Sequence, residues 1–189
     1  MADRKRVAIL ISGRGSNMMS LVAAADGAYE VALVASDKPD AAGLGWAKAQ
    51  GLATWALSPK GIGKPAYEAA LDAALRDAGV GTIALAGYMR LLSDDFVARW
   101  RGRILNIHPS LLPKYKGLDT HARAIEAGDS HGGCSVHVVT EELDGGAVLG
   151  QAEVAIEPGD TPETLAARVL VAEHRLYPRV LADFVAQTS

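Results

Sequence analysis

The chain has 189 residues, 49% of them hydrophobic and 22% charged, which is enough for one α/β domain with a sizeable core. Its formal net charge of −3 argues against a general nucleic-acid-binding protein, because a phosphate backbone requires a basic surface, although small anionic ligands need only a local pocket. The single cysteine, Cys134, excludes an intramolecular disulfide, and no apolar run near the start is long enough for a signal peptide or a spanning helix, so we expect a soluble, cytoplasmic protein without a membrane partner.

Short apolar, β-branched runs alternate with Ala-rich helical stretches through the first part of the sequence, a pattern typical of a parallel sheet covered by helices. The predicted strands are Val7–Ile11, Val31–Ala35, a weaker one at Ala53–Leu57, Thr82–Ala86 and Arg103–Ile107. The predicted helices are Met18–Asp26, Leu44–Gln50, one from about Pro65 to Ala78, and one that Ser93 caps.

The pattern changes in the last third of the chain. A short helix capped by Asp119 or Thr120 ends at Gly128, and two strands, Cys134–Val139 and Val148–Val154, form an antiparallel pair. A last helix begins at Thr161 with Pro162 at its first position, and Pro178 is expected to kink or end it. The prediction is an α/β fold: a Rossmann-like, mostly parallel sheet with helices on both faces and an antiparallel C-terminal strand pair, with residues 1–189 in a single domain.

The loop between the first strand and the first helix reads S-G-R-G-S-N, Ser12 to Asn17. Its glycines let the backbone approach a ligand, and the following helix points free N–H groups outward, which favours a phosphate site. Asp37, after the second strand, raises the alternative of a dinucleotide fingerprint, although Met18 replaces the third glycine of that motif. A tight turn without a ligand is the remaining interpretation.

A second polar site is predicted at the end of the fifth strand, where Asn106 and His108 share one face. An amide and an imidazole at this edge can hold a carbonyl oxygen as it becomes an oxyanion, and Pro109 and Pro113 restrain the loop that follows. The alternative is a polar pair with only a structural role.

A carboxylate to complete acid–base chemistry is available at Asp144, in the turn E-E-L-D-G-G, although this turn also suits a simple hairpin. The chain has no G-x-S-x-G motif and no histidine spacing for a metal. Cys134 is expected in the core, while His121 and His137 either line the cleft or have packing and capping roles.

These segments, with L-A-G-Y-M-R-L-L-S, I-L-N-I-H-P-S-L-L-P-K-Y-K-G, S-V-H-V-V-T-E-E-L-D-G-G and E-H-R-L-Y-P, closely resemble the phosphoribosylglycinamide formyltransferases along essentially the whole chain. The resemblance implies transfer of the formyl group of 10-formyltetrahydrofolate, a co-substrate, to the amine of glycinamide ribonucleotide in purine synthesis, without a metal. Two related families, methionyl-tRNA formyltransferases and formyltetrahydrofolate deformylases, carry an additional domain for which this sequence leaves no room. The expected partners are small molecules, with the protein a monomer or a homodimer.

The resemblance also implies roles for individual residues. The catalytic residues are Asn106, His108 and Asp144. The ribonucleotide is bound by Gly15, Ser16, Asn17, Leu170, Val171, Ala172 and Glu173. The folate is bound by Lys64, Met89, Arg90, Leu91, Leu92, Asn106, Thr140, Glu141, Glu142, Leu143 and Asp144. Lys64 stands where relatives often carry Arg, which weakens any bidentate contact there.

Overall fold

The computed structural model describes residues 3–187, so the first two and last two residues of the predicted domain lie outside the described part. Seven strands form one sheet in the order β3-β2-β1-β4-β5-β6-β7. The strands are β1 (Arg6–Ile11), β2 (Glu30–Ser36), β3 (Thr54–Ala56), β4 (Thr82–Leu85), β5 (Ile104–His108), β6 (His131–Val138) and β7 (Val148–Ala155). Strands β1 to β5 pair in parallel, β6 pairs antiparallel with β5, and β7 with β6. The predicted fold class is confirmed, and the antiparallel pair extends the parallel sheet.

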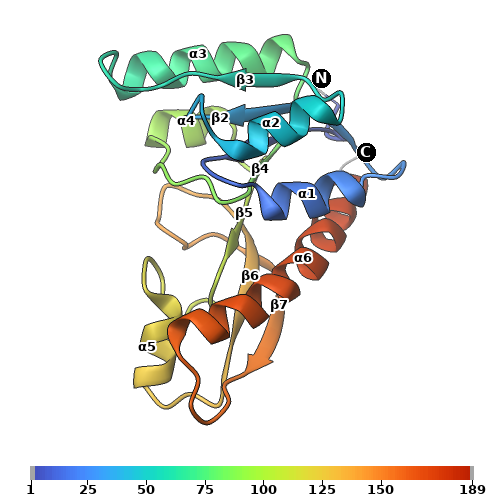
Figure 1. Cartoon of the computed structure of the whole chain (residues 1–189). Helices are drawn as coiled ribbons and strands as arrows, with labels where there is room; N and C mark the ends of the chain where they lie inside the picture. The colour runs from blue at the N-terminus through green and yellow to red at the C-terminus, as the bar shows by residue number, and fades with distance from the viewer. Residues whose placement is uncertain (1–2, 188–189) are drawn as a thin grey trace.

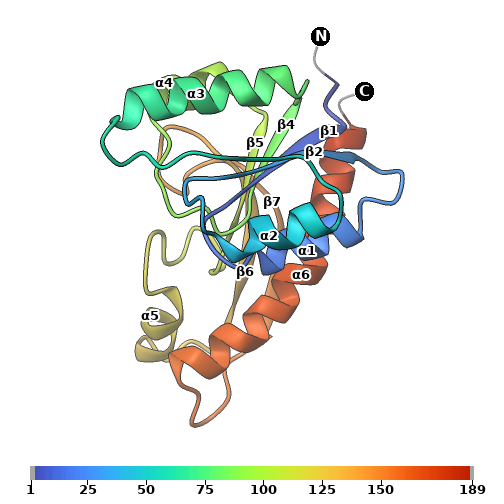
Figure 2. The same ribbon diagram turned by 45° about the horizontal axis from the view of Figure 1, so that its top comes forward.

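Helices cover both faces of this sheet (Figures 1 and 2). They are α1 (Ser16–Ala23), α2 (Ala42–Ala49), α3 (Lys64–Asp77), α4 (Asp94–Arg99), α5 (Thr120–Glu126) and α6 (Pro162–Ala186). Alternate residues of β1 enter different cores: Ile9 packs with residues of α1, α2 and α6, whereas Leu10 packs with residues of α3 and α4. The strand is therefore apolar throughout because both of its faces are buried.

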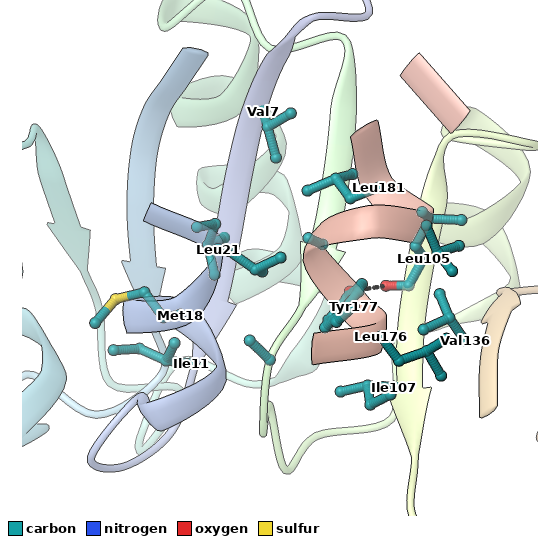
Figure 3. Close-up of a cluster of buried hydrophobic side chains, with 14 of the residues drawn as sticks. Val7, Ile11, Met18, Leu21, Leu105, Ile107, Val136, Leu176, Tyr177 and Leu181 are labelled. Carbon is teal, nitrogen blue, oxygen red and sulfur yellow. Dashed lines mark hydrogen bonds between the residues drawn. The ribbon is translucent and has the colours of Figure 1, made fainter. Parts of the chain in front are cut away.

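The long helix α6 packs across the middle of the sheet (Figure 3). Its residues Leu176, Tyr177 and Leu181 pack over side chains of β5 and β6 in one buried cluster. The buried Tyr177 hydroxyl lies 3.0 Å from the Leu85 carbonyl and 3.2 Å from the Leu105 carbonyl, which joins the helix to β4 and β5.

The prediction that Pro178 could end the last helix is wrong, because α6 continues to Ala186. Proline lacks an N–H and costs a helix interior about 3 kcal/mol. Buried residues on both sides of it, including Tyr177 and Leu181, keep the two halves of the helix on the sheet and offset that cost.

The start of α1 differs from the predicted boundary, whereas that of α5 agrees with it. Helix α1 begins at Ser16, two residues before the predicted Met18, because Gly15 takes the N-cap position in a left-handed conformation with φ 75°. Asp119 is the N-cap of α5, but its side chain makes no capping hydrogen bond. The Thr120 hydroxyl instead donates to the Pro109 carbonyl at 2.6 Å. Within residues 3–187, none of the helices is both long and apolar enough to cross a membrane.

Candidate active site

Two large cavities open where the parallel strands end. The first, of about 660 Å³, is bordered by Asn17, His108 and Glu173, and the second, of about 600 Å³, by Lys64, Leu92 and residues 139–144. Both volumes are typical of small-molecule sites. Asn106 and Asp144 line both cavities, so these two polar side chains lie where the cavities meet.

The orientation of the Asn106 amide is set by His137 on the neighbouring strand β6. The Nδ1 of His137 lies 3.1 Å from the Val138 carbonyl, which can only accept, so Nδ1 carries the hydrogen. Burial lowers the pKa of His137, which favours the neutral ring and makes Nε2 an acceptor. The Asn106 amide donates to this Nε2 at 3.3 Å, which leaves its second N–H for a ligand.

His108 stands between a carbonyl and a carboxylate. Its Nε2 donates to the Tyr115 carbonyl at 2.9 Å, and its Nδ1 lies 3.5 Å from Asp144 Oδ2. Both side chains of this pair are almost fully buried, at 7% and 8% exposed. Nδ1 of His108 therefore faces the carboxylate of Asp144.

The turn that carries Asp144 depends on close backbone approaches. Asp144 has φ 49°, and its Oδ2 accepts the Gly117 N–H at 2.9 Å. A Cβ atom on Gly146 would lie 1.7 Å from the Val138 carbonyl oxygen. Glycine is thus required at this position, and the turn is more than a hairpin connection because it delivers a buried carboxylate to His108 and His137.

Hydrogen bonds from β6 and β7 hold the loop that follows β5, in addition to its two prolines. The buried Ser135 hydroxyl donates to the Ser110 carbonyl at 2.7 Å and accepts the Leu112 N–H at 3.0 Å. The Gln151 amide donates to the Leu112 carbonyl at 2.8 Å. The antiparallel strand pair therefore positions the exit of β5 and, with it, His108.

The predicted phosphate loop reaches α6 through one buried contact. The Asn17 amide donates to Glu173 Oε2 at 2.8 Å, and the two side chains lie in the wall of the first cavity. Asn17 Oδ1 is buried and has no partner among the described residues. Burial raises the pKa of Glu173, and the hydrogen bond from Asn17 opposes this effect. The pair offers acceptors to a ligand that brings hydroxyl groups.

The dinucleotide alternative is not supported, because Asp37 faces the protein. It is only 6% exposed, and its Oδ1 accepts the Ser12 hydroxyl at 2.6 Å. A carboxylate committed to a buried serine is not available to a ribose.

Most of the predicted binding residues border the cavities. Both cavities are lined by Arg90, Leu91 and Leu143, and the first cavity also by Met89. The second cavity is lined in addition by Lys64, Leu92 and residues 140–142. Gly15 and Ser16 line neither cavity; at the start of α1 they immediately precede Asn17, which borders the first cavity.

Neither cavity is lined by the predicted residues Leu170, Val171 and Ala172 of α6. Of these, Leu170 and Val171 are 37% and 51% exposed. On α6, Glu163 and Ala166 line the first cavity together with Glu173. Ala166 precedes Glu173 by seven residues, or about two helical turns, so the helical period rather than adjacency would have identified it.

Sequence reasoning also missed Tyr88, which lines both cavities, and it left His121 and His137 undecided. His121 lines the first cavity, and burial lowers its pKa, with the neighbouring His108 contributing. The register of β5 and β6, in which Asn106 pairs with His137, is the signal that could have identified His137 as a site residue. No group of three or more His, Cys, Asp or Glu side chains in residues 3–187 is arranged to hold a metal ion.

Comparison with known proteins gives consistent matches. The model of the formyl transferase family matches residues 5–181. Phosphoribosylglycinamide formyltransferase of Escherichia coli is 44% identical over 182 residues, which cover 94% of this chain and 86% of that protein. A trifunctional purine biosynthetic protein of Drosophila melanogaster is 47% identical, but the chain spans only 14% of its length.

Among solved structures, phosphoribosylglycinamide formyltransferase of Brucella melitensis superposes with a TM-score of 0.92 at 55% identity and covers 97% of this chain and 96% of that one. The match of fold, sequence and length with these proteins shows that the chain belongs to the formyl transferase family.

Proposed function

We propose that this protein transfers the formyl group of 10-formyltetrahydrofolate to the amine of glycinamide ribonucleotide. The observation that carries the proposal is the position of Asn106 and Asp144 at the junction of two cavities, with His108 beside Asp144. A transfer reaction requires two substrates to meet at one set of catalytic groups, and this junction supplies such a place. The names of the relatives from Escherichia coli and Brucella melitensis support the same reaction.

The first cavity suits the ribonucleotide. Backbone N–H groups of Gly15 and Ser16 at the start of α1 are free to bind a phosphate, which the helix dipole also favours. Glu173, which borders this cavity and is held by the Asn17 amide, is an acceptor for the ribose hydroxyl groups. The substrate amine then extends toward Asn106 and His108, which line the same cavity.

The second cavity suits the folate. Leu92, Val97 and Val139 give it apolar surface for a flat ring system, and residues 140–144 supply backbone and side-chain polar groups. Lys64 contributes a cation in the same wall, where it suits the acidic benzoylglutamate end of the folate. The chain's own residues thus match both the ring and the charged tail of this co-substrate.

The catalytic side chains have distinct roles in this proposal. As the neutral amine adds to the formyl carbon, the second N–H of Asn106 donates to the oxygen that gains negative charge, and the positive charge of a protonated His108 stabilises the same oxygen. Asp144 stabilises the His108 imidazolium and takes up a proton from the attacking nitrogen, directly or through water. The new carbon–nitrogen bond forms, the bond to N10 of the folate breaks, and the proton passes to N10.

The test is a formyl-transfer assay with the purified protein, 10-formyltetrahydrofolate and three acceptors: glycinamide ribonucleotide, aminoimidazole carboxamide ribonucleotide and tRNA. We expect rapid transfer to the first acceptor alone. Equally rapid release of formate without any acceptor would instead identify a deformylase and would refute the proposed transfer. The cytoplasmic location, the single domain over residues 1–189 and the monomeric or homodimeric state stay predictions.

A further inference from the structure

Ser12 occupies a central place at the carboxyl edge of the sheet. Its hydroxyl donates to Asp37 Oδ1 at 2.6 Å and accepts the Met89 N–H at 2.9 Å. A hydroxyl has one hydrogen and two lone pairs, so both bonds are made at once. Because β1 lies between β2 and β4, this one oxygen joins the ends of three neighbouring strands. Ser12 and Asp37 are 5% and 6% exposed.

The segment that Ser12 holds, residues 87–92, forms a wall shared by both cavities. We call it the wall segment. It has no helix or strand, and its Met89 and Leu91 side chains are 71% and 69% exposed. In the part of the chain that the structure describes, the Met89 N–H is the only backbone amide of this segment that donates to the protein. The hydroxyl pair of Tyr88 and Tyr67, 2.8 Å apart, is a side-chain anchor.

The other side of Ser12 is rigid. The following residue, Gly13, accepts the Gly43 N–H at 3.0 Å, which ties the phosphate loop to α2. Residues 7–11 of β1 are fully buried, and residues 7–10 are paired with both β2 and β4. The hydroxyl is therefore a fixed point that holds the backbone of the wall segment at Met89.

We propose that Ser12 is a positioning residue that fixes the wall segment in the conformation required for folate binding, although Ser12 itself lines neither cavity. Asp37 supports it by accepting the hydroxyl hydrogen, which directs a lone pair toward the Met89 amide. The inference rests on the proposed function, and it gives Asp37 a role other than ribose recognition.

The central variant is Ser12→Ala, with Ser36→Ala as the matched control. Ser36 is fully buried at the end of the adjacent strand, and its hydroxyl accepts the Lys38 N–H without a contact to the wall segment. Loss of one neutral hydrogen bond corresponds to about a three- to tenfold weaker interaction. We expect Ser12→Ala to raise the KM for the folate by that factor. Because Met89, Arg90 and Leu91 of the wall segment also line the first cavity, the KM for the ribonucleotide should rise as well, with kcat changed less than about twofold.

Hydrogen exchange of the Met89 amide supplies a readout that needs no substrate. We expect exchange to be at least about threefold faster in Ser12→Ala and unchanged in Ser36→Ala. Unchanged exchange and an unchanged folate KM in Ser12→Ala would overturn the proposal, as would a fall in kcat with the folate KM unaltered. If the wild-type protein transfers no formyl group, the proposed function fails, and exchange alone still decides whether Ser12 anchors the segment.

Two further variants serve as controls for the role of the Ser12 hydroxyl and for loss of folding. Asp37→Asn keeps an acceptor for the hydroxyl, so its exchange and folate KM should stay near wild type. A loss as large as that of Ser12→Ala would contradict the anchoring role. If Ser12→Ala does not fold, Ser12→Cys offers a similar volume with a weaker donor and acceptor. Its Met89 amide should exchange faster than in the wild type, and wild-type protection there would overturn the inference.

Discussion

Replacing Asn106 with alanine separates catalysis from folding. The side chain makes one hydrogen bond, to His137 at 3.3 Å, while the backbone of β5 keeps its pairing with β4 and β6. Loss of that bond should lower the free energy of unfolding by about 0.5–1.5 kcal/mol. Removal of an oxyanion donor raises a reaction barrier by about 2.7–4 kcal/mol, so kcat should fall by about 10²–10³-fold in a protein that remains folded.

Asn17→Ala is the matched control, because this second asparagine also lines the first cavity but lies on α1 beside Glu173. It should raise the KM for the ribonucleotide and change kcat little. Single-turnover transfer of a labelled formyl group, together with urea unfolding, measures both variants. A folded Asn106→Ala protein with kcat within about threefold of wild type, or an equal kcat loss in Asn17→Ala, would refute the assignment of the oxyanion donor.

Three other variants test separate features. The raised pKa of Glu173 means that the native protein binds more protons than the unfolded chain, so wild-type stability falls as pH rises from the unfolded to the folded pKa. In urea unfolding, Glu173→Gln should therefore have the same unfolding free energy as the wild type at about pH 4 and a larger one at about pH 8. An equal unfolding free energy at pH 8 would contradict the conclusion that burial raises the pKa of Glu173. Gly146→Ala forces a Cβ to 1.7 Å from a carbonyl oxygen of β6 and should lower kcat at least about tenfold, whereas Gly45→Ala, with open space around it, should leave kcat unchanged in the same assay. Tyr177→Phe removes two buried hydrogen-bonding contacts and should reduce the unfolding free energy by about 1–3 kcal/mol, measured in urea; an unchanged value would show that the hydroxyl does not fasten α6.

Much of the fold follows from local patterns, and the parts that do not have identifiable causes. The apolar runs of β1 and β5 predicted strands because both faces of each are buried. The end predicted for the last helix at Pro178 was wrong because tertiary packing outweighs the local cost of proline, and a linear sequence pattern does not contain that packing. Ser16 and Asn17 belong to α1 because Gly15 adopts the left-handed conformation, which sequence alone leaves open.

The site divides in the same way. Asn106, His108 and Asp144 were predicted, and the structure brings them to one junction. His137 stayed undecided because its role depends on strand pairing between β5 and β6 and on which ring nitrogen carries hydrogen. The family resemblance implied a binding role for the three residues before Glu173 on α6, which line neither cavity, because a helix presents one face to a cavity, at intervals of three, four and seven.

The fastening of α6 across β4 and β5 has a consequence for how the protein is made. Residues 162–186 are synthesised after every strand of the sheet, yet their side chains Leu165, Tyr177 and Leu181 belong to the core cluster that β1 and β5 share. Until these residues leave the ribosome, one face of the nascent sheet is covered only by α1 and α2, and the apolar side chains of β5 and β6 on that face stay exposed to aggregation. Glu173 arrives on the same helix, so the step that completes the core also completes the wall of the first cavity. A chain released early would thus lack both a closed core and a ribonucleotide site, which couples the quality of folding to the capacity for catalysis.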